Sequence, residues 1–285
     1  LLDGGAVRVR IVAPGGWMRA VFEETCDRAH LRWLSQEAKR RGESMGRVLA
    51  AAENDRTVYK ALGLRPVPPE LREGAAPAVP VDLLTTRHVL GAFHVHTDWS
   101  DGSHGIADMA RAAAAAGFGY VGISDHSKAA VYAHGLDERR LASQAQAVAA
   151  ARREVPEITL LHGVEVDILP DGSLDLTDHA LAGLDFVIAS VHTRHNMPPA
   201  EMTKRICRAI THPLVTMLGH PTGRLLTGKG GYRFDMGEVA RTAAAHDVYL
   251  EINANPHRLD LSDQDARAAA AYGARFVINP DAHSP

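Results

Sequence analysis

The chain has 285 residues, of which 46% are hydrophobic and 23% charged, and its formal net charge at pH 7 is −3. This is a globular composition, large enough for one α/β barrel and a smaller unit. No apolar run approaches the roughly 20 residues that a helix needs to span a bilayer, so we expect no membrane partner. Cys26 and Cys207 are too few for a disulfide framework, which favours a cytoplasmic location.

Charge and histidine divide the chain into two parts. Residues 1–87 carry a net charge of +3 and residues 88–285 a net charge of −6, and His30 is the only one of the 16 histidines before His88. The basic part suits a polyanion, and the acidic, histidine-rich part suits cations. Pro and Gly are frequent over residues 66–80, which indicates a boundary. We therefore predict a first segment at 1–73, a linker at 74–87 and a second domain at 88–285.

The first segment is predicted to be a small α+β unit. Val7–Val12 alternates like a strand, and Phe22–Arg41 has the apolar spacing of one amphipathic helix. A basic run ends this helix and precedes Gly42, and its residues are Lys39, Arg40 and Arg41. Two interpretations stay open for that run, since cations followed by Gly are an ordinary helix stop and are also suited to contact DNA.

The second domain alternates apolar runs with helical stretches, which is typical of an α/β barrel. The expected strands are Val89–His96, Tyr120–His126, Thr159–Ile168, Phe186–His192, Val215–His220, Val248–Asn253 and Arg275–His283. The expected helices are 105–116, 137–154, 174–182, 199–211, 235–246 and 262–272. All expected strands but the sixth end in, or carry near their end, a histidine or carboxylate that can bind a metal ion.

Two pairs of side chains give the strongest indication of a metal site. Alternate residues of a strand share a face, so His94 can point with His96, and Asp281 with His283, towards one place. Both pairs follow apolar runs, at the carboxyl ends where parallel α/β folds hold their sites. Further donors of the same kind follow other runs, namely Asp125, His126, Glu165, His192 and His220. Together they predict a cluster of metal ions.

The motifs that carry these residues resemble those of PHP (polymerase and histidinol phosphatase) domains. They stand in order at 94–102, 124–126, 163–167, 190–192, 219–221 and 280–283. Two further segments, 165–176 and 58–73, resemble the PHP domain of bacterial family X DNA polymerases and the junction before it. The resemblance implies a distorted (β/α)7 barrel, and it makes the chain similar to the C-terminal part of such a polymerase.

The resemblance also implies the ligands of three divalent ions. One ion would lie on His94, His96, Glu165 and Asp281, one on Asp101, His126 and His283, and one on Glu165, His192 and His220. Mn²⁺ is favoured by analogy with the family, and nitrogen and oxygen donors also suit Zn²⁺ or Fe²⁺. Water activated by metals on the catalytic residues Glu165, His94 and Asp281 would attack a phosphodiester. The implied activity is 3′→5′ exonuclease action on DNA, in DNA repair.

The resemblance departs from the family at the first segment. Arg8 stands where the last palm strand usually has an Asp, and a guanidinium does not bind Mg²⁺. The usual Thr-Gly-Ser turn of the thumb is Thr25-Cys26-Asp27. Most palm carboxylates are expected before Leu1, so nucleotidyl transfer would need residues outside this sequence. Related polymerases also continue beyond the position of Pro285 with a helical tail.

Substrate contacts and two other functions complete the expectations. Arg224, His134 and His195 follow ligand-bearing strands and are candidates for binding phosphate, with a structural contact at a loop base as the alternative for Arg224. A small-molecule phosphomonoesterase of the histidinol-phosphatase type uses the same barrel, but the basic first segment argues against it. A noncatalytic, metal-stabilised module that holds DNA is the third hypothesis, and the full ligand set argues against it.

Overall fold

The computed structural model describes residues 9–75, 83–228 and 230–285. The chain separates into two compact units, Leu1–Leu84 and Thr85–Pro285. The division falls within the segment 74–87 that the sequence predicts as a linker, of which residues 76–82 lie outside the described residues. Within the described ranges, no helix is both long enough and apolar enough to cross a membrane.

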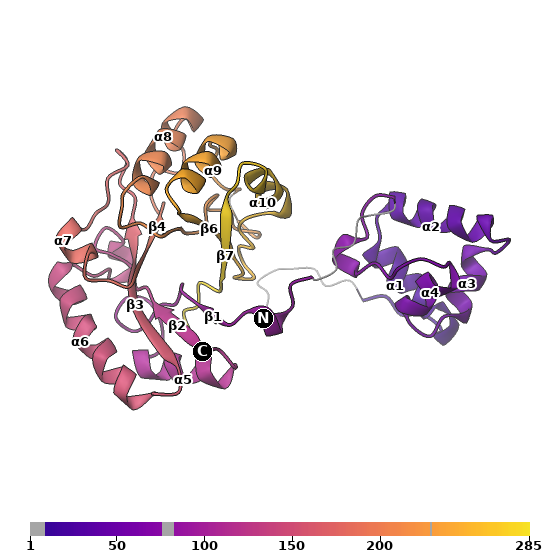
Figure 1. Cartoon of the computed structure of the whole chain (residues 1–285), viewed down its shortest axis with the longest axis horizontal. Helices are drawn as coiled ribbons and strands as arrows, with labels where there is room; N and C mark the ends of the chain where they lie inside the picture. The colour runs from indigo at the N-terminus through magenta and orange to yellow at the C-terminus, as the bar shows by residue number, and fades with distance from the viewer. Residues whose placement is uncertain (1–8, 76–82, 229) are drawn as a thin grey trace. The chain divides into compact units, whose positions relative to one another are not determined.

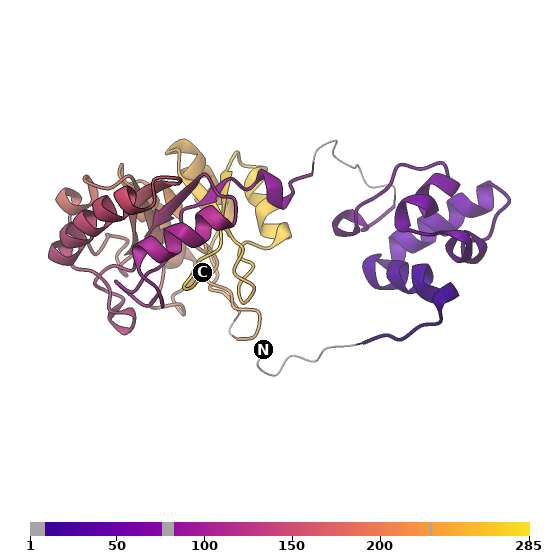
Figure 2. The ribbon, with the colours of Figure 1, turned by 90° about the horizontal axis from the view of Figure 1, so that it is seen from below.

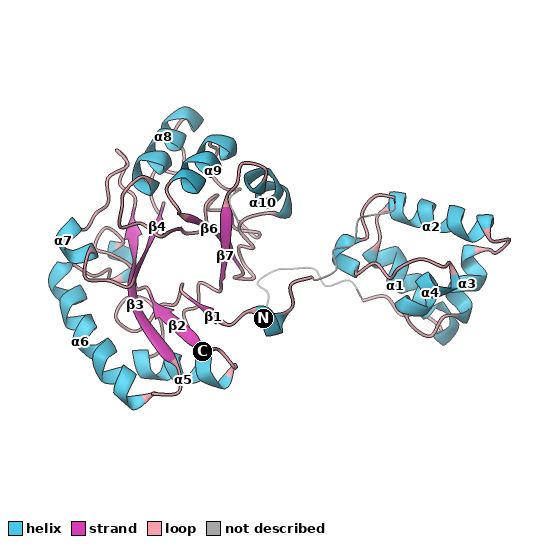
Figure 3. Cartoon of the chain, viewed as in Figure 1, coloured by secondary structure: helices cyan, strands magenta, loops and turns pink. Residues whose placement is uncertain are grey.

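The first unit is a small helical bundle (Figure 3). Its elements are the 3₁₀ turn η1 (Pro14–Gly16), the helices α1 (Trp17–Thr25), α2 (Arg28–Arg40), α3 (Met45–Ala51) and α4 (Asp55–Ala61), and the 3₁₀ turn η2 (Pro69–Leu71). Phe22 and Tyr59 are fully buried in its core. The Arg72 guanidinium lies 4.7 Å from the centre of the Phe22 ring and donates to Asp55 at 2.7 Å, so even this buried cation is paired.

Two expectations for this unit are wrong within the described residues. The single helix Phe22–Arg41 is divided into α1 and α2, because Asp27 has extended backbone and its side chain accepts from the His30 amide at 2.6 Å as the N-cap of α2. The strand Val7–Val12 does not form over residues 9–12, and residues 7 and 8, including Arg8, lie outside the described residues. The described part of the unit is therefore helical and not α+β.

The second unit is a nearly closed barrel of seven parallel strands in sequence order, which confirms the predicted α/β barrel (Figure 1). The strands are β1 (Gly91–Ala92), β2 (Tyr120–Ile123), β3 (Thr159–Asp167), β4 (Phe186–Ser190), β5 (Met217–Leu218), β6 (Tyr249–Asn253) and β7 (Arg275–Asn279). A parallel bridge between Val95 and Ala282 links the chain after β1 to the chain after β7. The first and last strands are thus joined at their carboxyl ends.

Helices surround the strands, as parallel crossovers require (Figure 1). They are α5 (Ile106–Ala115), α6 (Glu138–Glu154), α7 (Asp178–Leu181), α8 (Pro199–Ile210), α9 (Met236–Ala245) and α10 (Asp263–Ala270), and the 3₁₀ turns η3 (Thr86–His88) and η4 (Val131–Ala133) complete the unit. Figure 2 shows α5 and α6 side by side, and both contact β-strands of the first half of the barrel. The helical shell leaves the carboxyl ends of the strands free to hold side chains.

Several elements are shorter than the sequence predicts, and at β1 and α7 side chains take the place of backbone partners. After β1, the Phe93 amide donates to the Asn279 side chain at 2.9 Å and the Val95 amide to Ser124 Oγ at 3.1 Å, so the regular ladder ends at Ala92. The helix expected over 174–182 begins only at Asp178, since the Asp175 carboxylate accepts hydrogen bonds that hold its segment in bends outside the helix.

Candidate metal centre

All nine predicted ligands converge at the carboxyl end of the barrel. His94 and His96 follow β1, His126 follows β2, Glu165 lies in β3, His192 follows β4, His220 follows β5, and Asp281 and His283 follow β7. Asp101 comes from the loop between β1 and α5. The imidazoles of His94 and His96 and the carboxylate of Glu165 are completely buried. Side chains from six different strand ends and one loop therefore meet at one place.

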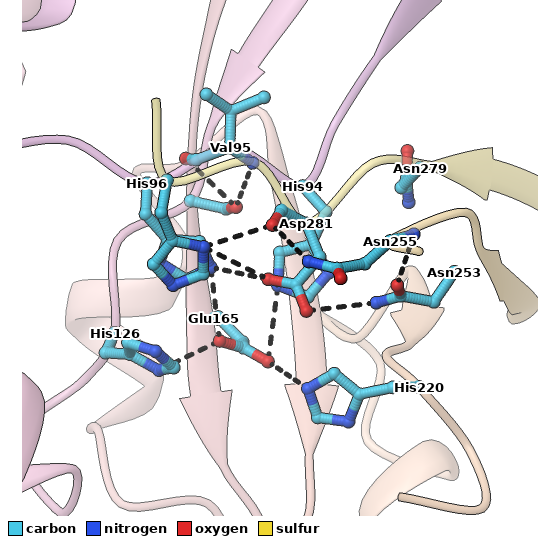
Figure 4. A network of polar contacts seen from close by, with 12 residues as sticks. His94, Val95, His96, His126, Glu165, His220, Asn253, Asn255, Asn279 and Asp281 are labelled. Carbon is cyan, nitrogen blue, oxygen red and sulfur yellow. Dashed lines mark hydrogen bonds and ion pairs between the residues drawn. The ribbon is translucent and has the colours of Figure 1, made fainter. Parts of the chain in front are cut away.

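Glu165 lies at the centre of this cluster, between His126 and His220 (Figure 4). Its Oε1 is 2.9 Å from Nε2 of His220, 3.2 Å from Nε2 of His192 and 3.3 Å from Nε2 of His94. Its Oε2 is 2.8 Å from Nδ1 of His126 and 3.6 Å from Nε2 of His96. Both oxygens thus face several nitrogen donors, as a carboxylate that bridges two ions must.

The donor atoms form four overlapping groups that can hold a metal ion, each with atoms within 4.8 Å of one another. They are His96, Asp101, His126 and His283; His94, Glu165 and His220; His94, His96 and Asp281; and His126, Glu165 and His192. The expected set of Asp101, His126 and His283 lies within the first group, and the third group holds the expected set of His94, His96 and Asp281 without Glu165. The expected set of Glu165, His192 and His220 is divided between the second and fourth groups. The number of ions and their identity remain predictions.

Many buried donor atoms of the cluster have no hydrogen-bond partner among the described residues. They include Nε2 of His94, both ring nitrogens of His96 and His192, Nδ1 of His220 and Oε2 of Glu165. Buried polar atoms are costly without a partner, and proteins seldom leave so many together. Divalent ions would satisfy them, and a donor set of imidazole and carboxylate without thiolate suits Mn²⁺, Zn²⁺ or Fe²⁺.

The electrostatics of the cluster also favour cations. Burial alone would raise the pKa of Glu165, but the neighbouring imidazoles, His192 and His94 foremost, lower this pKa well below its ordinary value. Burial likewise opposes protonation of His192, but the carboxylates of Glu165 and Asp167 raise its pKa to about 10. The carboxylates are therefore ionised at neutral pH, and a divalent cation can replace protons on the imidazoles.

Two ligands have left-handed backbone, with φ of 24° at His220 and 51° at Asp281. Such conformations cost energy in residues other than glycine and persist only where the surroundings impose them. At His220 the backbone amide donates to Glu251 at 2.6 Å, and at Asp281 the carboxylate accepts from Asn253 at 3.1 Å. These contacts accompany a conformation in which His220 faces Glu165 and Asp281 faces His94 and His96.

The sequence analysis missed a buried carboxylate behind the ligands. Glu251 in β6 accepts from Nδ1 of His94 at 2.7 Å, which leaves Nε2 of His94 facing Glu165. Asp167 lies 3.2 Å from Nδ1 of His192, as an ion-pair contact without the geometry of a hydrogen bond. Carboxylates in this position fix the tautomer and orientation of metal-binding imidazoles. A signal was present, because Glu251 and Asn253 are polar residues at alternate positions of the sixth apolar run, where no ligand was predicted.

Asp125, which belongs to one of the motifs, is not a donor of the cluster but anchors the loop that carries Asp101. Its carboxylate accepts from the Thr97 amide at 2.7 Å, from Ser100 Oγ at 2.5 Å and from Gln144 Nε2 at 2.6 Å. The side chain is fully buried, so each of these hydrogen bonds is protected from water. Asp125 therefore connects β2, the loop after β1 and helix α6.

The three predicted phosphate-binding residues lie in different surroundings. The Arg224 guanidinium donates to the backbone carbonyls of Arg258 and Leu259, which matches the alternative of a structural contact. His134 is exposed and has a φ of 54°. His195 lines a cavity together with His192 and His220. A phosphate contact remains a prediction for all three, and the geometry favours His195.

The predicted DNA-binding run lies at the C-terminus of α2. Lys39 and Arg40 occupy its last turn, and Arg41 is its C-cap residue. Arg40 pairs with Glu37 at 2.6 Å. This arrangement fits the helix-stop interpretation, because cations in the last turn are stabilised by the helix dipole. DNA contact by Lys39, Arg40 and Arg41 remains a prediction.

A parallel α/β barrel that gathers histidines and carboxylates at its strand ends defines a class of metal-dependent hydrolases. The family model described as "PHP domain" matches residues 92–255. The chain therefore belongs to the PHP domain family. The matched range contains the ligands from His94 to His220 as well as Glu251.

Relatives of this chain include a polymerase and phosphatases. The chain is 35% identical to the DNA polymerase/3′-5′ exonuclease PolX of Bacillus subtilis, over 98% of this chain and 51% of that protein. It is 32% identical to a protein of Caldicellulosiruptor saccharolyticus named "Probable phosphatase", over 46% of this chain and 56% of that protein. The chain thus spans about half the length of these relatives.

Among solved structures, one described as a "putative histidinol phosphatase" from Listeria monocytogenes shares the fold. Its TM-score is 0.51 at 13% identity, and the match covers 68% of this chain and 95% of that chain. At this identity the likeness concerns the fold alone. A shared fold does not indicate the reaction or the substrate.

Proposed function

We propose that this chain is the PHP-bearing part of a family X DNA polymerase and that its barrel hydrolyses DNA from the 3′ end, in DNA repair. The observation that carries the proposal is the cluster of nine donors around Glu165, in a chain similar over 98% of its length to the Bacillus subtilis polymerase/exonuclease. The cluster supplies the chemistry, and the similarity indicates the substrate.

Three divalent ions bound at the cluster, with Mn²⁺ favoured and Zn²⁺ or Fe²⁺ as alternatives, would act as Lewis acids and lower the pKa of water. The protein's part is to hold the donors in place. Glu165 offers both oxygens, and His94 and Asp281 complete one side of the cluster, with Nε2 of His94 3.5 Å from Oδ1 of Asp281. We assign Glu165, His94 and Asp281 as the residues through which catalysis acts.

The first unit would contribute DNA binding. Its basic residues at the end of α2, Lys39, Arg40 and Arg41, would contact phosphates without sequence preference. Nucleotidyl transfer would belong to the longer protein, with Arg8 in place of an expected carboxylate as a reason for weak activity. We propose the bacterial cytoplasm as the compartment, in keeping with Cys26 and Cys207, which are both free thiols.

The test is degradation of a 3′-recessed, 5′-labelled DNA by this chain with Mn²⁺. Stepwise shortening is expected for the wild type and should be lost in His94→Ala and with a chelator. His246→Ala is the matched control, because His246 is an exposed histidine outside the cluster, and it should retain activity. No shortening by a protein that has been shown to bind metal would refute the nuclease assignment.

A phosphomonoesterase is the second candidate, and the relatives named as phosphatases and the fold of the Listeria protein favour it. Hydrolysis of a small phosphomonoester at a much higher kcat/KM than DNA would establish it. Binding of metal and DNA without hydrolysis of any phosphoester would instead establish the third candidate, a module that holds DNA.

A further inference from the structure

A cavity of about 470 Å³ opens beside the metal cluster. Its lining includes His192 and His220 of the cluster, together with Tyr132, His195, Tyr232 and Arg258. Its volume is within the roughly 300–1,000 Å³ of sites for small ligands. A group bound in this cavity would contact two of the proposed metal ligands. The part of a substrate that is attached to the reacting phosphate would therefore lie in the cavity.

Arg258 provides the positive charge of the cavity. Its Nε lies 3.2 Å from Oδ2 of Asp281, which orients the guanidinium, and its side chain is 24% exposed. The contact with Asp281 is made through Nε, at one edge of the guanidinium. A guanidinium fixed through Nε presents its other edge to an anion, and that edge matches two oxygens of a phosphate.

Tyr132 provides an exposed aromatic surface at the same cavity. The residue is 67% exposed although it is a large ring, and the ring centre lies 6.1 Å from that of His126 in the metal cluster. Leu225, which also lines the cavity, is 42% exposed. Exposed rings and apolar groups beside a charged catalytic site are the features that proteins use to stack unpaired bases.

Tyr232 gives an independent indication that the cavity holds a ligand. It is 7% exposed and lines the cavity, but its hydroxyl has no hydrogen-bond partner among the described residues. An unpaired buried hydroxyl calls for a partner that the protein itself does not supply. A polar group of a bound nucleoside, or a water molecule that accompanies it, would be such a partner.

We propose that this cavity binds the terminal nucleoside of an unpaired DNA 3′ end, with Tyr132 stacking on the base and Arg258 holding the phosphate. The inference rests on the proposed function, since it names the part of DNA that enters the site. A base that leaves the duplex stack to enter the cavity cannot keep its partner, so the last nucleotide would be unpaired when it binds. Base–aromatic stacking tolerates any base, which is what processive shortening of DNA requires.

The experiment compares two single-stranded oligonucleotides, one with a 3′-terminal thymidine and one with a 3′-terminal abasic nucleotide. Wild type should show about a tenfold lower KM for the end that bears a base, from the usual strength of base–aromatic stacking. Tyr132→Ala should abolish this preference, and Tyr132→Phe should keep it. Val131→Ala is the matched control, because Val131 is the neighbouring exposed residue and does not line the cavity.

Binding is measured separately, so that the inference does not depend on hydrolysis. Fluorescence anisotropy with labelled oligonucleotides that carry a phosphorothioate at the last linkage should give the same preference and the same loss in Tyr132→Ala. Equal affinity of wild type for the two ends, or a preference unchanged in Tyr132→Ala, overturns the inference. Preferential binding without cleavage of the phosphodiester substrates supports the inference and refutes the proposed nuclease.

Discussion

Replacement of Glu251 by glutamine tests whether the carboxylate behind the cluster is needed to orient its ligands. Oε1 of Glu251 accepts from Nδ1 of His94 at 2.7 Å and from Nδ2 of Asn279 at 3.0 Å. Oε2 accepts from the His220 amide at 2.6 Å and from Nδ2 of Asn253 at 3.1 Å. All four partners are donors, so either orientation of a glutamine amide sets its NH₂ group against two of them.

The expected effect follows from this geometry. Glu251→Gln loses two hydrogen bonds and the charge that holds the proton on Nδ1 of His94, and loss of such a partner usually weakens metal binding about 10- to 100-fold, or about 1.4–2.8 kcal/mol. The charge matters because burial opposes protonation of His94, whereas Glu251, Asp281 and Glu165 raise its pKa well above the ordinary value.

Calorimetric titration of Mn²⁺ into metal-free protein measures the effect directly. Glu238→Gln is the matched control, because Glu238 is an exposed carboxylate on α9, and its affinity should equal that of wild type. If Glu251→Gln binds metal as tightly as wild type, then Glu251 does not orient His94 and the reasoning fails. Glu251→Asp keeps the negative charge on a shorter side chain. It should bind Mn²⁺ more tightly than Glu251→Gln only if the shorter side chain still contacts His94.

Three further predictions concern stability. Burial lowers the pKa of His162 to about 4, so the folded state binds fewer protons than the unfolded state from about pH 6.5 downwards. The free energy of unfolding, measured with urea, should therefore fall by about 2–3 kcal/mol between pH 7 and pH 4.5. The fall should be smaller in His162→Gln. Equal losses would contradict this. Asp27→Ala should cost the first unit about 1 kcal/mol by removing the α2 N-cap, and Asp27→Asn should cost less. Chelation should lower the melting temperature of wild type more than that of His94→Ala.

The barrel and the gathering of histidines and carboxylates at its strand ends could be predicted because their signals are local. A pair such as His94 and His96 shows the period of a strand, and an apolar run shows where that strand lies. Element lengths could not be predicted in the same way. β1 ends after two residues because Asn279, from the other end of the chain, takes the amide of Phe93. No local pattern shows that a side chain 186 residues away will replace a ladder hydrogen bond.

The same distinction applies within the site. Residues that contact the proposed ions stand in recognisable motifs, whereas Glu251 and Asp167 act through a ligand and are visible only once the strands are side by side. The break between α1 and α2 was in principle readable, since Asp27 is a favoured N-cap residue within an otherwise helical pattern. The apolar residues on both sides of Asp27 have the spacing of one continuous helix, and this spacing led to the prediction of a single helix.

The barrel also determines the side from which a substrate can reach the cluster. In the register of β3 and β4, Gly163 pairs with Phe186 and Glu165 pairs with Ile188. Phe186, Ile188 and Met217 form an apolar group in the barrel, and a side chain at Gly163 would collide with the Phe186 ring. Below Glu165 the barrel is therefore packed. Access is left on the side where the 470 Å³ cavity lies against His192 and His220, so the groups at that cavity decide which phosphoester the metals meet.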